Sequence, residues 1–259
     1  MNIFINQSKL SNQTRTILIG GSSHAGKSTL AQYLAAKLGW NYRSTDKLAR
    51  HPGRPWIQDN KKFIPQHVVE HYQNLSPEEL FVDVISHYEK NVLPQVEDIV
   101  CSEECLIIEG SALYPGLVRN LVRENEVKAI WLTGSEQLFR TRIYKESNFD
   151  NVGENEKYLI EKFLQRTLLY NQRMMELVRN LGFIYIDVES ISNTDELSTK
   201  CMEMILKNSF QTFLSDGTFI TNQQNTTFIN LAIGKFKSSW LNNFPKQGNT
   251  RTHHKRIYF

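Results

Sequence analysis

The sequence predicts an α/β fold: a doubly wound five-stranded parallel sheet with helices on both faces. Short apolar runs of strand length alternate, along the first 206 residues, with longer stretches that carry apolar side chains at helical spacing. Strands separated by helices of ten or more residues imply βαβ units and parallel pairing. The five expected strands cover residues 16–20, 40–44, 106–108, 127–132 and 183–188.

Helix signals fall between these strands. Residues 28–38 carry three leucines on one stripe and stop at Gly39. A second helix is expected to begin with Ser76 as its N-cap, and Pro94 is expected to kink or end it. The prolines and glycine of residues 50–66 predict a loop. The other expected helices cover residues 156–181 and 194–206.

Composition is that of a soluble globular protein, with 40% hydrophobic and 22% charged residues in 259. No apolar run approaches the roughly 20 residues of a membrane span, and the N-terminus lacks a secretion signal, so a cytoplasmic location without membrane partners is expected. Cys101 and Cys105 have no nearby histidine or cysteine to complete a zinc set, so reduced thiols are expected.

Three segments are expected: a flexible N-terminus (1–14), one folded domain (15–207), and a polar, basic C-terminal extension (208–259), poorly ordered or loosely packed. Residues 207–259 hold seven Lys or Arg and one Asp, a charge of +6, so the rest of this +3 chain sums to −3. A uniformly basic nucleic-acid binder would not divide its charge this way, which disfavours a nucleic-acid partner.

A phosphate-binding loop follows the first strand. The segment GSSHAGKS matches G-x-x-x-x-G-K-[ST] at every fixed position, and an amphipathic helix follows it. Its backbone N–H groups and the helix N-terminus would hold the phosphates of ATP, Lys27 would reach the β- and γ-phosphates, and the Ser28 hydroxyl would ligate Mg²⁺. The expected nucleotide-binding residues are Gly21, Ser22, Ser23, His24, Ala25, Gly26, Lys27, Ser28 and Thr29.

Through this loop and the order of its elements, the segment 16–206 resembles the small P-loop kinases, a group that includes nucleoside, nucleotide, adenylylsulfate and sugar-acid kinases. The resemblance implies a first strand at the sheet's centre, with the second and third to one side, and a small helical lid. It also implies Mg²⁺-assisted transfer of the ATP γ-phosphoryl group to a small-molecule acceptor.

Two acidic residues match positions of this group. Asp46 follows the second strand, where such kinases often hold the acceptor hydroxyl; the alternative is a cap for the residues that follow. Glu109 ends the third strand at the place of a Walker B acid, where it could hold Mg²⁺ through water or contact substrate. The alternative for Glu109 is a structural role at a buried edge.

Arginines supply the remaining candidates. Arg140 and Arg142 follow the fourth strand, where related kinases place the lid whose arginines close over the transferred group. Arg140 is favoured because it is closer to the strand. The alternative is that both arginines lie on a solvated helix without a role in the site. Arg50 and Arg54, on a proline-stiffened loop, suit an anionic acceptor; the alternative is a loop docked onto the sheet by Trp56. The expected catalytic residues are Lys27, Asp46, Arg140 and Arg142, with Asp46, Arg50, Arg54 and Glu109 binding the acceptor.

Other P-loop classes fit less well. The sequence has no N-K-x-D guanine motif, and the apolar run before Glu109 does not end in the Asp-Glu pair of a motor ATPase. Two alternatives to a small-molecule kinase stay open: an ATPase that acts as a nucleotide-dependent switch for a protein partner, and a nucleic-acid-end kinase that uses the basic tail.

Overall fold

The protein is represented by a computed structural model, which describes residues 14–49, 51–57, 63–102, 105–122 and 126–215. The chain divides into two compact units, Met1–Ile205 and Leu206–Phe259. The first unit contains the sheet and the whole candidate site. Of the second unit, only residues 206–215 are described, and they are helical.

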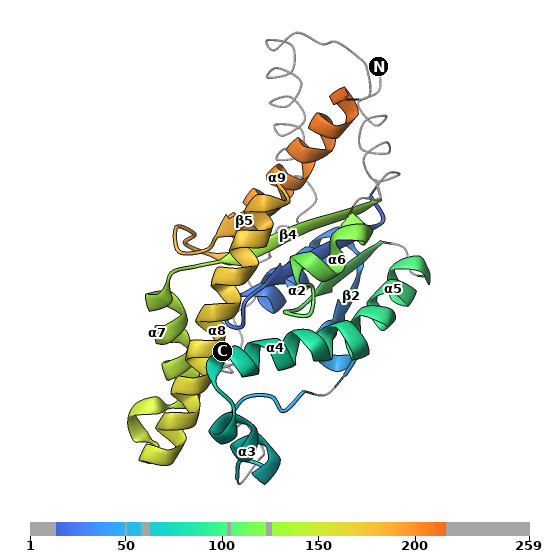
Figure 1. Ribbon diagram of the computed structural model, residues 1–259. Coiled ribbons are helices and arrows are strands. Elements are labelled where there is room, and N and C mark those ends of the chain that lie inside the picture. Colours follow the sequence, from blue (N-terminus) through green and yellow to red (C-terminus); the bar gives the residue numbers. More distant parts are fainter. Residues whose placement is uncertain (1–13, 50, 58–62, 103–104, 123–125, 216–259) are drawn as a thin grey trace, which may run out of the picture. The chain divides into compact units, whose positions relative to one another are not determined.

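The first unit is built on a parallel sheet whose strand order is β2-β3-β1-β4-β5 (Figure 1). This order confirms the expected five-stranded parallel sheet, with the first strand central and the second and third to one side. Because all strands run parallel, their carboxyl ends meet at one edge, where Ile19 and Ser44 flank Glu109 in register. The strands are β1 (Thr16–Gly21), β2 (Asn41–Ser44), β3 (Leu106–Glu109), β4 (Val127–Thr133) and β5 (Ile184–Asp187).

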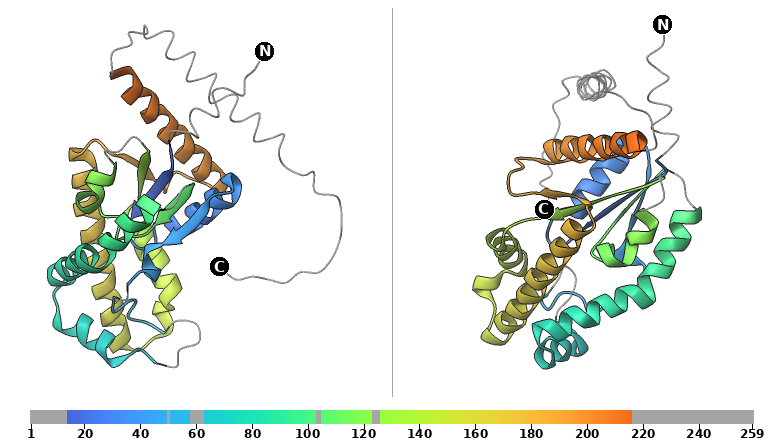
Figure 2. Two further views of the ribbon diagram at one scale, coloured as in Figure 1. Left: turned by 90° about the vertical axis from the view of Figure 1, so that its right-hand side faces the viewer. Right: turned by 45° about the horizontal axis from the view of Figure 1, so that its top comes forward.

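Helices cover both faces of the sheet (Figure 2). On one face, Leu18, Ile108 and Trp131 pack in a core with side chains of α5, α6 and α8. On the other side α2 lies beside α9, where Tyr33 and Lys37 both bind Asp195 at 2.8 Å. The helices are α2 (Lys27–Leu38), α3 (Gln66–Asn74), α4 (Pro77–His87), α5 (Leu93–Ser102), α6 (Pro115–Val122), α7 (Glu136–Ser147), α8 (Glu154–Asn180) and α9 (Thr194–Ser215).

The start of α4 has the local structure that the sequence predicts. The Ser76 side chain accepts from the Glu79 amide, and the Glu79 carboxylate accepts from the Ser76 amide, which makes a capping box. Pro94 does not end the helical run. A π-helical turn, η2 (Tyr88–Val92), joins α4 to α5, and Pro94 lies in the first turn of α5. The wider turn accommodates the missing proline N–H, so the helices continue with a changed register.

The last described helix crosses the expected domain boundary. α9 continues to Ser215, beyond the predicted helix end at 206 and the expected boundary at 207. The rest of the predicted extension, residues 216–259, lies outside the described part of the chain, as do residues 1–13 of the expected flexible N-terminus. Among the described helices, none is long and apolar enough to cross a membrane.

Candidate active site

The phosphate loop lies at the carboxyl end of β1, next to the strands that carry the acidic residues. Two of its residues have left-handed backbone, His24 at φ 65° and Gly26 at φ 92°, and α2 begins directly afterwards at Lys27. Such a turn lets successive backbone N–H groups converge on an anion at the helix N-terminus. The Ser22 hydroxyl donates to the Thr167 carbonyl at 3.0 Å, which fastens the loop to α8.

Lys27 lies folded back inside this loop. Its ammonium group donates to the Ser22 carbonyl oxygen at 2.7 Å, and the side chain is buried. Burial lowers the pKa of Lys27, while the charges of Glu109 and Asp46 raise it and that of Arg54 lowers it. The lysine thus sits in the electrostatic field of both predicted acids.

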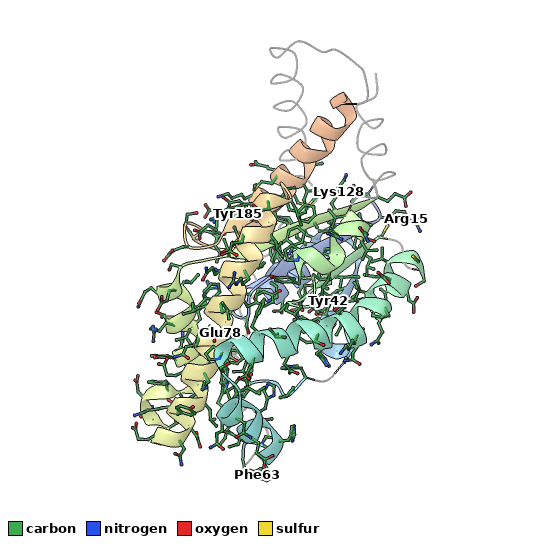
Figure 3. The ribbon with its side chains drawn as sticks, in the orientation of Figure 1. Arg15, Tyr42, Phe63, Glu78, Lys128 and Tyr185 are labelled. Atoms are coloured by element: carbon green, nitrogen blue, oxygen red, sulfur yellow. The ribbon has the colours of Figure 1, made fainter. Side chains whose placement is uncertain are left out.

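The two acids have different surroundings. Glu109, at the end of β3, is 2% exposed and accepts a hydrogen bond at 3.0 Å from the hydroxyl of Tyr42, which Figure 3 labels. Gly110 after it has φ 150°, and a Cβ there would lie 1.7 Å from the Thr45 hydroxyl oxygen. Asp46 is exposed on η1 (Thr45–Lys47), the 3₁₀ turn after β2. A buried acid and an accessible one suit different tasks.

The two lid arginines point to different partners. Arg142 donates to the His24 carbonyl at 2.7 Å, and its Nη1 lies 3.9 Å from where a Cβ on Gly26 would be. Arg140 instead pairs with Glu136 at 2.9 Å and Glu161 at 3.4 Å. The structure therefore brings Arg142 to the phosphate loop and holds Arg140, the arginine favoured from sequence, between α7 and α8.

The loop of residues 51–57 docks beside the phosphate loop. Trp56 is 3% exposed, and its ring meets Phe163 of α8 edge-on at 4.9 Å between ring centroids, so it packs on a helix. Arg54 forms an ion pair with Glu146 of α7. The other oxygen of Glu146 lies 2.9 Å from His24 Nε2. Arg50 lies outside the described residues.

The protonation states of this bridge follow from its burial. Burial lowers the pKa of His24, against the raising effect of Glu146, so the imidazole is neutral at pH 7. Burial raises the pKa of Glu146, but the close contact with His24 and the charge of Arg54 outweigh it, and the net pKa is lowered. A neutral His24 and an ionised Glu146 thus connect the phosphate loop to α7 and to Arg54.

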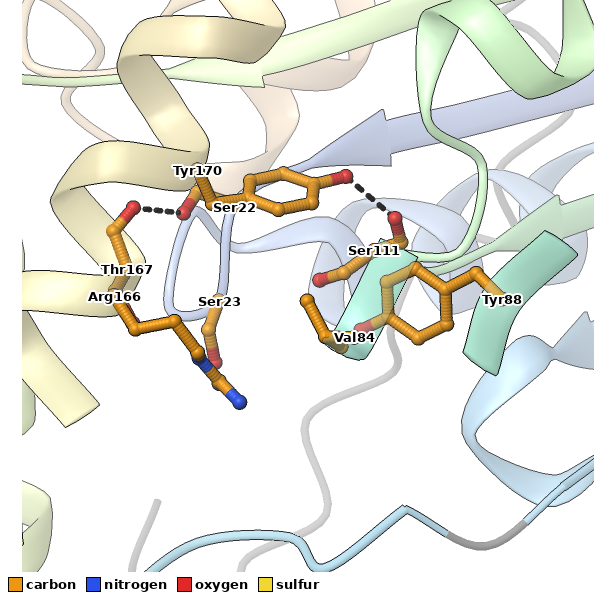
Figure 4. A pocket seen from close by; sticks show the side chains of 8 residues that line it. All are labelled: Ser22, Ser23, Val84, Tyr88, Ser111, Arg166, Thr167 and Tyr170. Carbon is orange, nitrogen blue, oxygen red and sulfur yellow. Dashed lines mark hydrogen bonds between the residues drawn. The ribbon is translucent and has the colours of Figure 1, made fainter. Parts of the chain in front are cut away.

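A hollow opens beside the phosphate loop, between α8 and the junction of α4 with η2 (Figure 4). In Figure 4 the Arg166 guanidinium points toward Ser23, and the Tyr170 hydroxyl donates to the Ser111 carbonyl. Arg166 also donates to the Tyr72 hydroxyl at 3.0 Å and lies over the Phe163 ring at 4.6 Å. The hollow is lined by Ser22, Ser23, Val84, Tyr88, Ser111, Arg166, Thr167 and Tyr170.

Most predicted residues therefore meet at one edge of the sheet. Ser28 and Thr29 open α2 with exposed side chains, close to the loop residues already described. Three residues that shape the site were not predicted: Arg166, Glu146 and Tyr170. Arg166 and Tyr170 are four apart in the helix before the last strand, a spacing that places them on one helical face and that could have marked them.

Comparisons with known proteins agree with this architecture. No family model matches the chain. The chain is 28% identical over 200 residues to a 2-phosphoglycerate kinase of Methanocaldococcus jannaschii; the match covers 73% of this chain and 62% of that protein, less than two thirds of its length.

Solved structures of small kinases match the chain over most of its length. A gluconokinase from Sinorhizobium meliloti matches at 15% identity with a TM-score of 0.50, over 79% of this chain and 99% of that one. A shikimate kinase from Acinetobacter baumannii, solved with shikimate, matches at 20% identity with a TM-score of 0.44, over 78% and 98%. The gluconokinase match confirms that the predicted resemblance to small P-loop kinases holds for the fold.

Proposed function

We propose that the protein transfers the γ-phosphoryl group of ATP, with the help of Mg²⁺, to an oxygen of a small anionic acceptor in the cytoplasm. The observation that supports this most directly is the position of the hollow. It is lined both by Ser22 and Ser23 of the phosphate loop and by Arg166. The space is about 20 Å³, so its lining side chains must move apart to admit an acceptor, which would then lie against the phosphate loop.

On the nucleotide side, the backbone N–H groups of the loop bind the phosphates and Lys27 stabilises the charge that spreads over the transferred group. The residues present fit a magnesium ion. Ser28 offers an exposed hydroxyl at the first turn of α2, and Glu109 offers a carboxylate at the neighbouring strand end. Bound there, Mg²⁺ would neutralise charge on the β- and γ-phosphates. Arg142, already at the loop, closes this side.

On the acceptor side, Asp46 orients the attacking oxygen and Arg166 binds an anionic group. Asp46 is exposed, and its charge raises the pKa of Lys27, so it lies near the ammonium group. Arg166 presents a planar fork, which suits carboxylate or phosphate. The relative from Methanocaldococcus jannaschii is named for a phosphorylated hydroxy acid. We therefore favour a small acceptor with a carboxylate or phosphate group and a free hydroxyl or acid oxygen.

The test is ADP release by the purified full-length protein with ATP and Mg²⁺ across a panel of small acceptors. The panel contains phosphorylated hydroxy acids, sugar acids and nucleosides. We expect one anionic class to raise the rate well above the basal ATPase rate. Arg166→Met should then raise the KM for that acceptor at least about tenfold, the cost of one lost charge-assisted hydrogen bond, with little change in the KM for ATP.

A panel that leaves the basal rate unchanged would contradict the proposal and favour the nucleotide-dependent switch. Acceptor stimulation that survives Arg166→Met unaltered would keep the kinase activity but remove the hollow as the acceptor site. A matched control is Arg173→Met, since Arg173 is an exposed residue of the same helix that pairs with Glu176 at 3.5 Å.

A further inference from the structure

A second cluster of titratable side chains lies away from the phosphate loop. It consists of His51 on the loop of residues 51–57, His71 on α3, and Asp83 and His87 on α4. His51 Nε2 lies 3.3 Å and His71 Nε2 lies 4.0 Å from Asp83 Oδ2. One nitrogen from each of these two histidines and one Asp83 oxygen all lie within 4.8 Å of one another.

The histidines of this cluster are largely buried, and two of them have a ring nitrogen without a hydrogen-bond partner in the described part of the chain. The side chains of His51 and His71 are only 13% and 12% exposed, and their rings meet edge-on with centroids 5.3 Å apart. The Nε2 atoms of His71 and His87 are buried and have no hydrogen-bond partner among the described residues. A buried polar nitrogen without a partner costs free energy, and a ligand bound by His71 Nε2 would offset that cost for His71.

We propose that His51, His71 and Asp83 form a zinc site with water as the fourth ligand. Zinc prefers imidazole and carboxylate ligands in tetrahedral geometry, with ligand distances of about 2.0–2.2 Å, whereas Mg²⁺ prefers oxygen ligands alone. Those distances place two ligand atoms about 3.3 Å apart. One of the three separations, 3.3 Å, already has this value, the second is 4.0 Å and all three lie within 4.8 Å, so the side chains must draw closer together to complete the site.

The charges around the cluster set the strength of binding. Burial lowers the pKa of His51 to about 4, and Arg166 acts in the same direction. Burial also lowers the pKa of His71. The charge of Asp83 raises this pKa, and the charges of Arg166 and His67 lower it. Both imidazoles are therefore neutral at pH 7, the form that binds metal. Arg166 also repels a dication, and Asp83 supplies one negative charge, so we expect moderate affinity.

Metal here would join three elements. The loop of residues 51–57 carries Arg54 and Trp56, while α4 and the turn after it carry Val84 and Tyr88 of the hollow. A zinc ion held by His51, His71 and Asp83 would fix the loop to α3 and α4. This is a stabilising role, and it does not depend on the proposed kinase activity.

The experiment titrates the metal-free, full-length protein with Co²⁺ and Zn²⁺. Tetrahedral cobalt gives visible absorption bands, and thiolate ligands would add near-ultraviolet charge-transfer bands that imidazole and carboxylate do not. We expect about one tetrahedral cobalt ion per chain, with visible bands and no thiolate bands, and we expect zinc to displace it. Adding zinc should also raise the thermal midpoint.

Variants assign the site. His51→Ala and Asp83→Asn should each weaken metal binding at least about tenfold to a hundredfold, the range seen when a supporting residue of a metal site is lost. His67→Ala, an exposed histidine on α3, is the matched control and should bind as the wild type does. Circular dichroism without metal checks that each variant folds. Equal zinc affinity and stoichiometry in the wild type and in both His51→Ala and Asp83→Asn would overturn the proposal, as would thiolate bands.

Discussion

Replacing Lys27 by methionine removes the ammonium group inside the phosphate loop while keeping a chain of similar length. The ammonium already lies 2.7 Å from the Ser22 carbonyl, so it needs only a small swing to reach phosphates bound by the same loop. A unit charge pair about 4 Å apart interacts by roughly 4 kcal/mol at an effective dielectric constant near 20. Loss of one such contact in a transition state typically costs about 3 kcal/mol, or at least about a hundredfold in turnover.

The stability of the same variant should change little, because the fold does not favour this charge. Burial lowers the pKa of Lys27 despite the raising effect of Glu109 and Asp46, so the protonated lysine is less favourable in the folded chain than in the unfolded one. Removing the charge by substitution therefore removes the same unfavourable contribution to folding that deprotonation would remove. The lost hydrogen bond to Ser22 opposes this by about 1 kcal/mol. We expect a thermal midpoint within a few degrees of the wild type.

This pKa also predicts a pH dependence. The folded pKa of Lys27 lies below its value of 10.5 in the unfolded chain. Between these two values the unfolded chain binds more protons, so this residue makes the free energy of unfolding rise with pH up to about 10.5. The rise should be smaller in Lys27→Met, as measured by urea denaturation between pH 8 and about pH 10.5.

The control for the activity measurement is Lys37→Met on the same helix. Lys37 pairs with Asp195 at 2.8 Å, near the opposite end of α2. Its loss should leave turnover unchanged, because Lys37 lies in the last turn of α2, away from the phosphate loop. Steady-state ADP release, with the best acceptor of the panel, measures both variants. Turnover of Lys27→Met within tenfold of the wild type would refute the role of the ammonium group, as would equal losses in both variants.

Three further perturbations test the surroundings of the loop. Gly110→Ala should lower the free energy of unfolding by about 1–3 kcal/mol, because its Cβ would lie 1.7 Å from the Thr45 hydroxyl oxygen; Gly153→Ala, with no atom within 4 Å, should not. Arg142→Ala should lower turnover by roughly tenfold or more at saturating ATP, and an unchanged rate would show that this contact is structural. Glu146→Gln should flatten the acid side of the stability curve, because the lowered pKa of Glu146 contributes stability that the wild type loses as pH falls; identical curves would count against the bridge.

Much of the fold could be predicted because the signals for strands are local. The apolar run predicted at 127–132 is β4, Val127–Thr133, and the buried run predicted at 16–20 is β1, Thr16–Gly21. α3 and α6 were not predicted. Each is short, and α3 buries only Val68 and Tyr72, too few residues for a helical period to stand out.

The candidate site also has parts that the local sequence predicts and parts that it does not. The phosphate loop could be predicted because all its parts are consecutive in sequence. The sequence favoured Arg140 because it is closer to the strand, but residues two apart lie on different sides of a helix, and only the packing of α7 decides which side faces the loop. The bridge from His24 through Glu146 to Arg54 joins three segments that are distant in sequence, so no local sequence pattern predicts it.

The loop of residues 51–57 is held on two sides by different chemistry, and this bears on what each perturbation can change. Toward the phosphate loop, Arg54 is fixed by Glu146, which also faces His24. Toward α4, His51 is fixed by Asp83 at 3.3 Å. No described residue of this loop lines the hollow, but Asp83 directly precedes Val84, which does, so the contact with His51 bears on the lining of the proposed acceptor site. Loss of the His51 contact should therefore raise the KM for the acceptor more than that for ATP, whereas loss of the Lys27 ammonium group should lower turnover with any acceptor.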